Sequence, residues 1–186
     1  QWQAVETEQP ASSLSLSPML VTDFCGFNAV EFRSPRMNNE PLDDGDLYWV
    51  NDLTLNATLD IQNSSLESVA VLELTEGVRA VQARFYPASG KVEILRRDRD
   101  ANGAYSEGTV VGAAESGASG DGEYQFSFAN VDDRVLLWIN GSLVSFDKDV
   151  TFVTNGFNLP GEQDLAPAGI AAKGMDITAS ALNIRR

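Results

Sequence analysis

Strict alternation of apolar and polar residues between Leu53 and Gln62 is the feature that most constrains the fold of this chain. Every second position carries an apolar side chain: Leu53, Leu55, Ala57, Leu59 and Ile61. The positions between them carry Thr54, Asn56, Thr58, Asp60 and Gln62. Successive side chains of a strand point to opposite faces, so this period predicts a half-buried strand with one face in the core and one in water.

Similar short runs follow along the chain, separated by turn residues. They cover residues 69–75, 81–86, 92–94, 124–129 and 176–184. No segment repeats apolar residues at helical spacing over three turns. Many strands with short connections and no helix predict an all-β protein, built as a two-sheet antiparallel β-sandwich.

The clearest local signal is a hairpin within residues 134–146. The run RVLLWI leads into Asn140 and Gly141, and the run SLVSF follows them. Asn-Gly accepts positive φ at both central positions of a type I′ turn, whose twist matches that of the flanking strands. The sequence therefore predicts a two-residue hairpin turn at Asn140–Gly141.

The 186 residues fit one sizeable domain. Residues 1–17 are rich in Ser, Glu and Gln and are expected to form a loose lead-in, whereas residues 18–186 form the sandwich domain. Two long connections are expected, at residues 112–122, which are rich in Gly, Ala and Ser, and at residues 147–167.

Composition excludes several classes of function. A net charge of −14 repels phosphate backbones, so nucleic acid is not expected as a partner. The chain has no histidine and a single cysteine, Cys25, which removes Ser-His and Cys-His catalysis, intrachain disulfides and zinc sites built on these residues. No apolar run approaches the roughly 20 residues of a membrane span, so no membrane insertion by this segment is expected.

Catalysis by the remaining residue types finds little support. The closest carboxylate pair on a strand-like run is Glu73 and Glu76, which we expect to be an outward strand residue and a turn residue rather than a glycosidase pair. A serine–lysine dyad would need a desolvated lysine. The sequence indicates no serine partner for Lys91, Lys148 or Lys173. We expect all three lysines to be solvated. The chain is therefore expected to be non-catalytic, with no cofactor other than a possible calcium ion.

The calcium hypothesis rests on the segment from Asp98 to Gly103. Asp98, Asp100 and Asn102 place oxygen-bearing side chains at alternate positions before a glycine, which is typical of a loop around a hard cation. The twelfth position of such a loop should be Glu, and here it is Thr109. A polar hairpin turn explains the same residues, because Asp, Asn and Gly are turn formers.

Trp138 is the best candidate for a binding residue, with Arg134 beside it. Alternation puts both on the strand face opposite Val135, Leu137 and Ile139. If the aliphatic face lines the core, a sugar ring can stack on the exposed Trp138. The alternative is that Trp138 is buried beneath a loop.

Three segments resemble a group of bacterial type I signal peptidases that carry a large inserted domain. These are LVTDFCGFNA at residues 20–29, FSFANVDDRVLLWING at 126–141 and DLAPAGIAAKG at 164–174. The second segment also resembles concanavalin-like domains of sugar-active proteins. The resemblance implies a jelly-roll sandwich of the concanavalin type.

The same resemblance implies a parent that is a membrane-anchored serine endopeptidase with a serine–lysine dyad. Its serine lies in a Ser-Met-x-Pro context, which this chain lacks, since Ser17, Pro18 and Met19 reverse the order. The chain is then a binding or scaffolding insert on the extracytoplasmic (periplasmic) side of the inner membrane, with preproteins, glycans or the parent's catalytic domain as partners. The alternative is a stand-alone carbohydrate-binding jelly roll or, third, a glycoside hydrolase-like protein.

Overall fold

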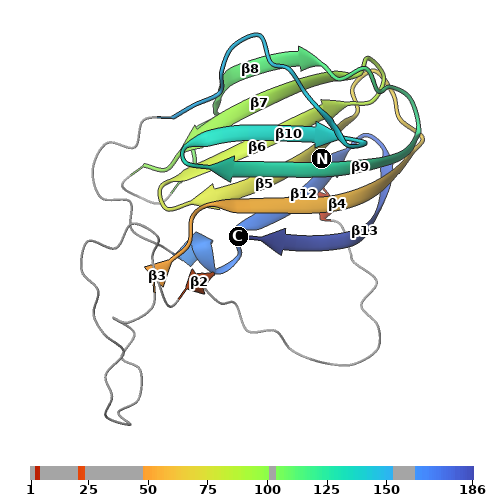
Figure 1. Ribbon diagram of the computed structural model, residues 1–186. Helices are drawn as coiled ribbons and strands as arrows, with labels where there is room; N and C mark the ends of the chain where they lie inside the picture. The colour runs from red at the N-terminus through yellow and green to blue at the C-terminus, as the bar shows by residue number, and fades with distance from the viewer. Residues whose placement is uncertain (1–2, 5–20, 24–47, 101–103, 153–161) are drawn as a thin grey trace, which may run out of the picture.

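The computed structural model describes residues 3–4, 21–23, 48–100, 104–152 and 162–186. Two antiparallel sheets face each other (Figure 1). The six-stranded sheet has the order β1 (Gln3–Ala4), β12 (Ala168–Lys173), β5 (Val69–Glu76), β6 (Arg79–Tyr86), β7 (Lys91–Asp98) and β8 (Thr109–Glu115). The five-stranded sheet has the order β11 (Ser142–Leu143), β10 (Arg134–Ile139), β9 (Gly122–Val131), β4 (Leu53–Gln62) and β13 (Asp176–Arg185). The predicted two-sheet antiparallel sandwich is confirmed.

Minor elements complete the described part of the chain. β2 (Thr22–Asp23) pairs with β3 (Tyr48–Trp49) in a small separate sheet. The 3₁₀ helix η2 (Glu162–Leu165) precedes β12. None of the described residues forms a helix that is long and apolar enough to cross a membrane.

The alternation predicted for β4 is confirmed residue by residue. Its odd-numbered side chains from Leu53 to Ile61 are buried, and the even-numbered ones are partly or fully exposed. The buried set meets the inward residues of β5, β6, β7, β9 and β10 in one core, which includes Phe85, Tyr124 and Phe126. Phe85 packs edge-on against both of the other rings, with centroids 5.2 and 5.6 Å apart. Burial of this apolar surface is the main favourable term in folding.

Two tight turns flank β10. Asn140 and Gly141 have φ of 51° and 77°, as the predicted type I′ turn requires. β11 is shorter than the sequence suggests, although the Val144 amide still donates to the Leu137 carbonyl at 2.8 Å. On the other side of β10, Asp132 and Asp133 also adopt positive φ, 50° and 60°, in the turn from β9.

The predicted loop at residues 112–122 is wrong in its first part. Thr109–Glu115 forms β8, which pairs with β7. Position 112 of this strand is a glycine because a Cβ there would come within 2.5 Å of Val150 Cγ2. The missing side chain therefore permits close packing of the segment that contains Val150 rather than flexibility.

The division of the chain at residue 18 stays a prediction. Gln3 and Ala4 of the expected lead-in form β1 and pair with Ala172 and Ala171 of β12. Residues 5–17 lie outside the described residues, as does Cys25.

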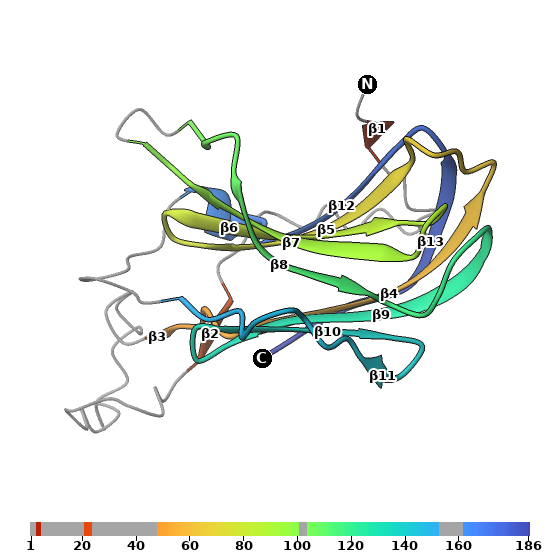
Figure 2. The ribbon, with the colours of Figure 1, turned by 90° about the horizontal axis from the view of Figure 1, so that it is seen from above.

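The sandwich is curved. Seen from above, both sheets bend in the same direction, upward at the end near β1 (Figure 2). The outer face of the six-stranded sheet is therefore concave, and that of the five-stranded sheet is convex. β13 is the last strand of the convex sheet, and its register with β4 breaks between Ser180 and Asn183.

Candidate ligand-binding face

The concave face is built by the outward residues of β5, β6 and β7. Ala70, Leu72 and Leu74 of β5 point into the core, so the residues between them point outward. The same alternation applies to β6 and β7. The polar residues brought together on this face, here called the concave polar cluster, are Glu73, Gln82, Arg84, Tyr86, Lys91, Glu93 and Arg97.

A hydrogen-bonded chain forms the centre of this cluster. Gln82 and Glu73 lie opposite each other in the register of β6 and β5, and Gln82 Nε2 donates to Glu73 Oε2 at 2.5 Å. Arg84 donates from Nε and Nη2 to Gln82 Oε1, at 3.2 and 2.9 Å. Arg97 Nη1 lies 3.9 Å from Glu73 Oε2. These planar groups are held in place by one another, which reduces the ordering that a ligand would have to impose.

A second group lies across β6 and β7. Glu93 accepts hydrogen bonds from Lys91 Nζ at 2.6 Å and from the Tyr86 hydroxyl at 2.9 Å. Burial acts to raise the pKa of Glu93, but these two hydrogen bonds and the nearby positive charges of Lys91 and Arg84 hold it below its ordinary value. Burial, followed by the contact with Glu93, raises the pKa of Tyr86. Glu93 is therefore an ionised acceptor at neutral pH, and Tyr86 is a neutral donor.

An aromatic ring lies at one end of the cluster. Tyr105 lies beneath two guanidinium groups, with Arg97 at 5.1 Å and Arg99 at 5.5 Å from the ring centroid. Arg97 also donates from Nε to the Ser106 carbonyl at 3.0 Å. These contacts connect the cluster to the turn that follows β7.

The side of the concave face formed by β12 and β5 carries small apolar residues beside Glu73. Val71 lies opposite Arg84 in the register, and Ala171 lies opposite Val71. Gly169 is opposite Glu73, and a Cβ at Gly169 would meet only Glu73 Cβ, at 3.9 Å. Small side chains therefore border the long polar side chains of β6 and β7, and the more open positions among them are Gly169 and Ala171 of β12, since Val71 is 3% exposed.

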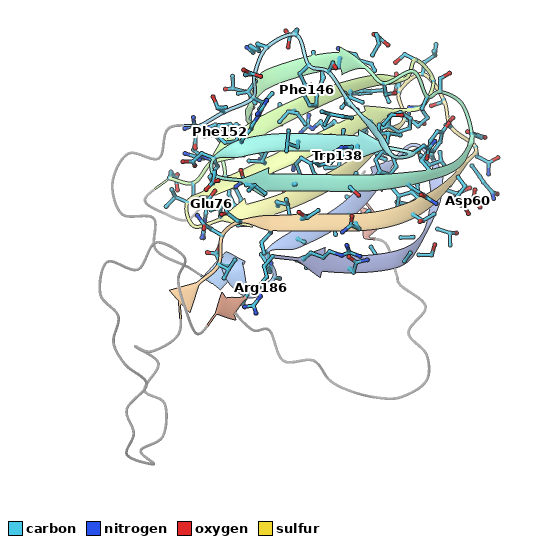
Figure 3. All side chains as sticks on the ribbon, viewed as in Figure 1. Asp60, Glu76, Trp138, Phe146, Phe152 and Arg186 are labelled. Atoms are coloured by element: carbon cyan, nitrogen blue, oxygen red, sulfur yellow. The ribbon has the colours of Figure 1, made fainter. Side chains whose placement is uncertain are left out.

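Trp138 and Arg134, the sequence candidates, lie on the opposite face of the molecule. Both point outward from β10, and Trp138 is half-buried on the convex sheet (Figure 3). Trp138 lies opposite Ser127 and Leu143 in the register. Arg134 lies 3.5 Å from Asp149 in an exposed ion pair. A ligand-binding role for these two residues stays a prediction.

The aspartates of the calcium hypothesis have other partners. Both carboxylate oxygens of Asp98 accept from Arg96 Nε at 3.0 Å, and Asp100 Oδ1 accepts from the Ala104 amide at 2.9 Å. Asn102 lies outside the described residues. Within the described ranges, no three Cys, Asp or Glu side chains are grouped to hold a metal ion. Calcium binding stays a prediction.

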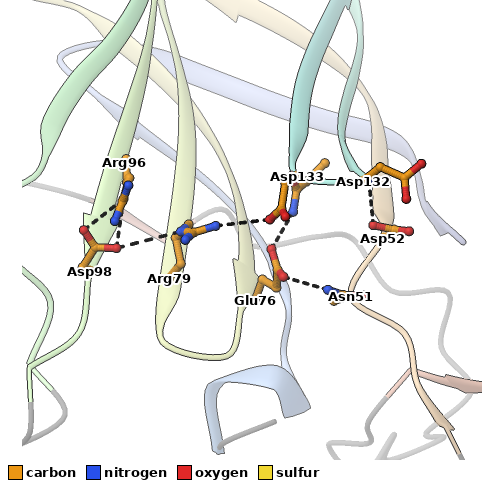
Figure 4. Close-up of polar contacts among 9 residues, drawn as sticks. Asn51, Asp52, Glu76, Arg79, Arg96, Asp98, Asp132 and Asp133 are labelled. Carbon is orange, nitrogen blue, oxygen red and sulfur yellow. Dashed lines mark hydrogen bonds and ion pairs between the residues drawn. The ribbon is translucent and has the colours of Figure 1, made fainter. Parts of the chain in front are cut away.

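The carboxylate pair considered for catalysis is divided between two faces. Three positions apart on β5, Glu73 points outward and Glu76 points toward the other sheet. Glu76 is not a simple turn residue, since it accepts from Asn51 Nδ2 at 2.7 Å and from Asn130 Nδ2 at 2.8 Å (Figure 4). Nearby, Arg79 lies 3.5 Å from Asp133 and 3.9 Å from Asp98. These contacts fasten the turns at one end of the sandwich.

Sequence reasoning missed the concave polar cluster, although one signal was available. Six of the 13 lysines and arginines lie between Arg79 and Arg99, together with only two of the 27 acidic residues. This segment covers β6, β7 and the turn between them. The positive charge of an otherwise strongly acidic chain is therefore concentrated at the six-stranded sheet.

Comparison with known proteins yields similarities of fold. A carbohydrate-binding module of Bacillus subtilis, CBM66, matches with a TM-score of 0.48 and 13% identity over 74% of this chain and 76% of that chain. A galectin of Caenorhabditis elegans matches with a TM-score of 0.45 and 12% identity over 73% and 84%. A GH43 protein of Bacillus licheniformis gives 0.39 and 11% over 74% of this chain and 25% of its own length.

No protein-family model and no curated protein sequence matches the chain. None of these comparisons connects it with type I signal peptidases. The class of protein shown is an all-β, two-sheet antiparallel β-sandwich.

Proposed function

We propose that this chain is a non-catalytic glycan-binding module whose ligand lies on the concave face. The observation that carries the proposal is the fixed chain of planar polar groups from Glu73 through Gln82 to Arg84, beside the low apolar surface of β12 and β5. Ligand sites typically combine apolar surface with a few polar groups in fixed positions.

The chemistry of the face matches that of a sugar. Each sugar hydroxyl donates and accepts, and the cluster offers acceptors at Glu73 and Glu93 and donors at Arg84, while the buried Gln82 holds Glu73 and Arg84 in place. The C–H side of a pyranose ring is apolar and can lie over Gly169 and Ala171 of β12, which are more open than the buried Val71. Five of the seven side chains of the cluster are partly buried, so their charge-assisted hydrogen bonds are less screened than those on a flat surface.

The test is binding of the purified chain to a panel of neutral and charged polysaccharides, followed by calorimetry with the best ligand. Gln82→Leu removes the amide that connects Glu73 and Arg84 and should weaken binding at least tenfold, about 1.4 kcal/mol. Gln125→Leu makes the same change on the exposed face of β9 and should bind as the parent does. Failure to bind any glycan would overturn the proposal, and equal binding by Gln82→Leu would overturn the choice of face.

The wider context is a separate proposal that rests on the sequence resemblance alone. There the module is an insert of a membrane-anchored signal peptidase-like protein and faces the extracytoplasmic side, close to preproteins and to the parent's catalytic domain. Sequencing the complete reading frame tests it. A Ser-Met-x-Pro segment after a membrane anchor and a later lysine segment would support it, and a frame without them would contradict it.

A further inference from the structure

Charge is distributed very unevenly over this molecule. The chain carries −14 overall, yet residues 79–99 hold six basic and two acidic side chains. Arg84, Lys91 and Arg97 of this segment point outward on the concave face. At physiological ionic strength the Debye length is about 8 Å, so the acidic surface of the far sheet is largely screened from a ligand on this face.

Most of these cations already have an acidic partner. Lys91 is bound to Glu93, and Arg97 lies near Glu73. Arg96 is paired with Asp98 beyond the end of the cluster. Their charges are therefore partly neutralised within the fold.

Arg84 differs from these cations. No carboxylate of the described residues lies within ion-pair distance of it, and its Nε and Nη2 donate to the neutral Oε1 of Gln82, with the neutral Tyr86 also close by. Glu93 is its neighbour in the β6–β7 register, but the Glu93 oxygens are bound by Lys91 and Tyr86. Arg84 is thus a half-buried guanidinium that is held in position by an amide and forms no ion pair among the described residues, although its charge still lowers the pKa of nearby Glu93.

The surface next to Arg84 can accommodate a ring. On its β5 side lies Val71, which is only 3% exposed, and beyond Val71 lies β12 with the partly exposed Ala171 and the exposed Gly169. A sugar ring over Gly169 and Ala171 would bring a carboxylate on its rim toward the Arg84 guanidinium. Arginine binds carboxylates through two parallel hydrogen bonds, and this arrangement is stronger than neutral hydrogen bonds.

We propose that the glycan of this module is anionic, a polymer of uronic acids, and that Arg84 binds one of its carboxylates. This inference rests on the proposed glycan-binding function and adds the class of sugar. Lys91, one row further along the face, is exposed and close enough in the register to attract the next carboxylate of the polymer.

The experiment compares polygalacturonate with the same polymer after complete methyl esterification, which removes the charge and keeps the sugar chain. Calorimetry on the full chain should show binding of the acid form and at least tenfold weaker binding of the ester. Arg84→Gln should reduce affinity for the acid at least tenfold and have little effect on the ester. Arg185→Gln, on β13 of the convex sheet, is the matched control and should bind as the parent does.

The outcomes separate the two proposals. Equal binding of acid and ester, or binding of neutral or sulfated glycans only, overturns the uronic acid inference and leaves glycan binding in place. Binding of the acid that is unchanged in a folded Arg84→Gln variant overturns the role of Arg84. Absence of binding to any glycan overturns both proposals. The comparison of acid with ester uses the parent protein, so it decides the inference even if Arg84→Gln fails to fold.

Discussion

Asn130 of β9 donates from Nδ2 to Oε2 of Glu76 in β5 at 2.8 Å, and this hydrogen bond joins the two sheets of the sandwich. Asn130 is 3% exposed and Glu76 is 4% exposed. The second oxygen of Glu76 accepts from Asn51, two residues before β4 (Figure 4). A buried carboxylate is tolerated because it is hydrogen-bonded in this way.

Asn130→Ala should lower the free energy of unfolding by about 2 kcal/mol, because Glu76 then loses a buried hydrogen bond to its charged oxygen. Urea denaturation at pH 7 measures the change. Gln125→Ala removes an exposed amide from the same strand and should stay within about 0.5 kcal/mol of the parent. Equal losses of unfolding free energy in the two variants would show that the hydrogen bond between Asn130 and Glu76 does not stabilise the fold.

Gly141→Val should destabilise the fold by about 1–2 kcal/mol, because a side chain with a branched Cβ resists the φ of 77° observed there. The melting temperature and the urea midpoint should both fall. Ser142→Val places the same side chain at the next, exposed strand position and is the control. A melting temperature unchanged in Gly141→Val would contradict the type I′ turn.

Gly112→Ala should cost about 1–3 kcal/mol, because its Cβ would clash with Val150 Cγ2 in a packed region. Val150→Ala should remove that clash, so the double variant should be more stable than the sum of the two single changes predicts. Gly169→Ala adds a methyl group to another strand glycine with open space around it, and should have a small effect. Strict additivity of the two changes would argue against the packing of β8 described above.

Glu93→Gln should change how the free energy of unfolding depends on pH. The pKa of Glu93 in the folded state is below its unfolded value of about 4.5, so its contribution is complete above that pH and is lost as the pH falls through the folded value. The parent should therefore be more stable than Glu93→Gln at pH 7, and the difference should narrow toward pH 3. Urea unfolding at pH 7, 5, 4 and 3 measures it, with Glu123→Gln as the control for net charge. A difference that stays constant or widens in acid would contradict the role assigned to Glu93.

How far the sequence predicts this fold depends on how local each signal is. The period from Leu53 to Ile61 and the Asn140–Gly141 turn follow from geometry within a few residues, and both are confirmed. β8 was missed because Gly112 is explained by Val150, a residue distant in the chain. Asp132 and Asp133 form a turn with positive φ, which Asp tolerates, so this turn had a local signal that was missed.

The candidate site was harder to predict than the fold. Gln82, Arg84 and Glu93 meet only through the register of β6 and β7, which depends on core packing across the whole sheet. Trp138 was predicted to bind a ligand because it is an aromatic residue at an outward position. The structure places it on the five-stranded sheet, away from the concave polar cluster. The concentration of basic residues between Arg79 and Arg99 was readable in advance, but only the strand order shows which of them face the same way.

The register break in β13 has a consequence for how copies of this protein behave in concentrated solution. β13 is an edge strand with exposed Leu182 and Ile184, and an uninterrupted edge of its length would offer a template for the strands of other copies. The break divides its pairing with β4 into runs of five and three residues, and Ala181 between them has a φ of 50°. Such a bulge bends the strand and interrupts the regular series of backbone amides and carbonyls that fibril growth requires. We therefore expect the irregularity at Ala181 to hinder amyloid-like stacking at this edge of the described sheet.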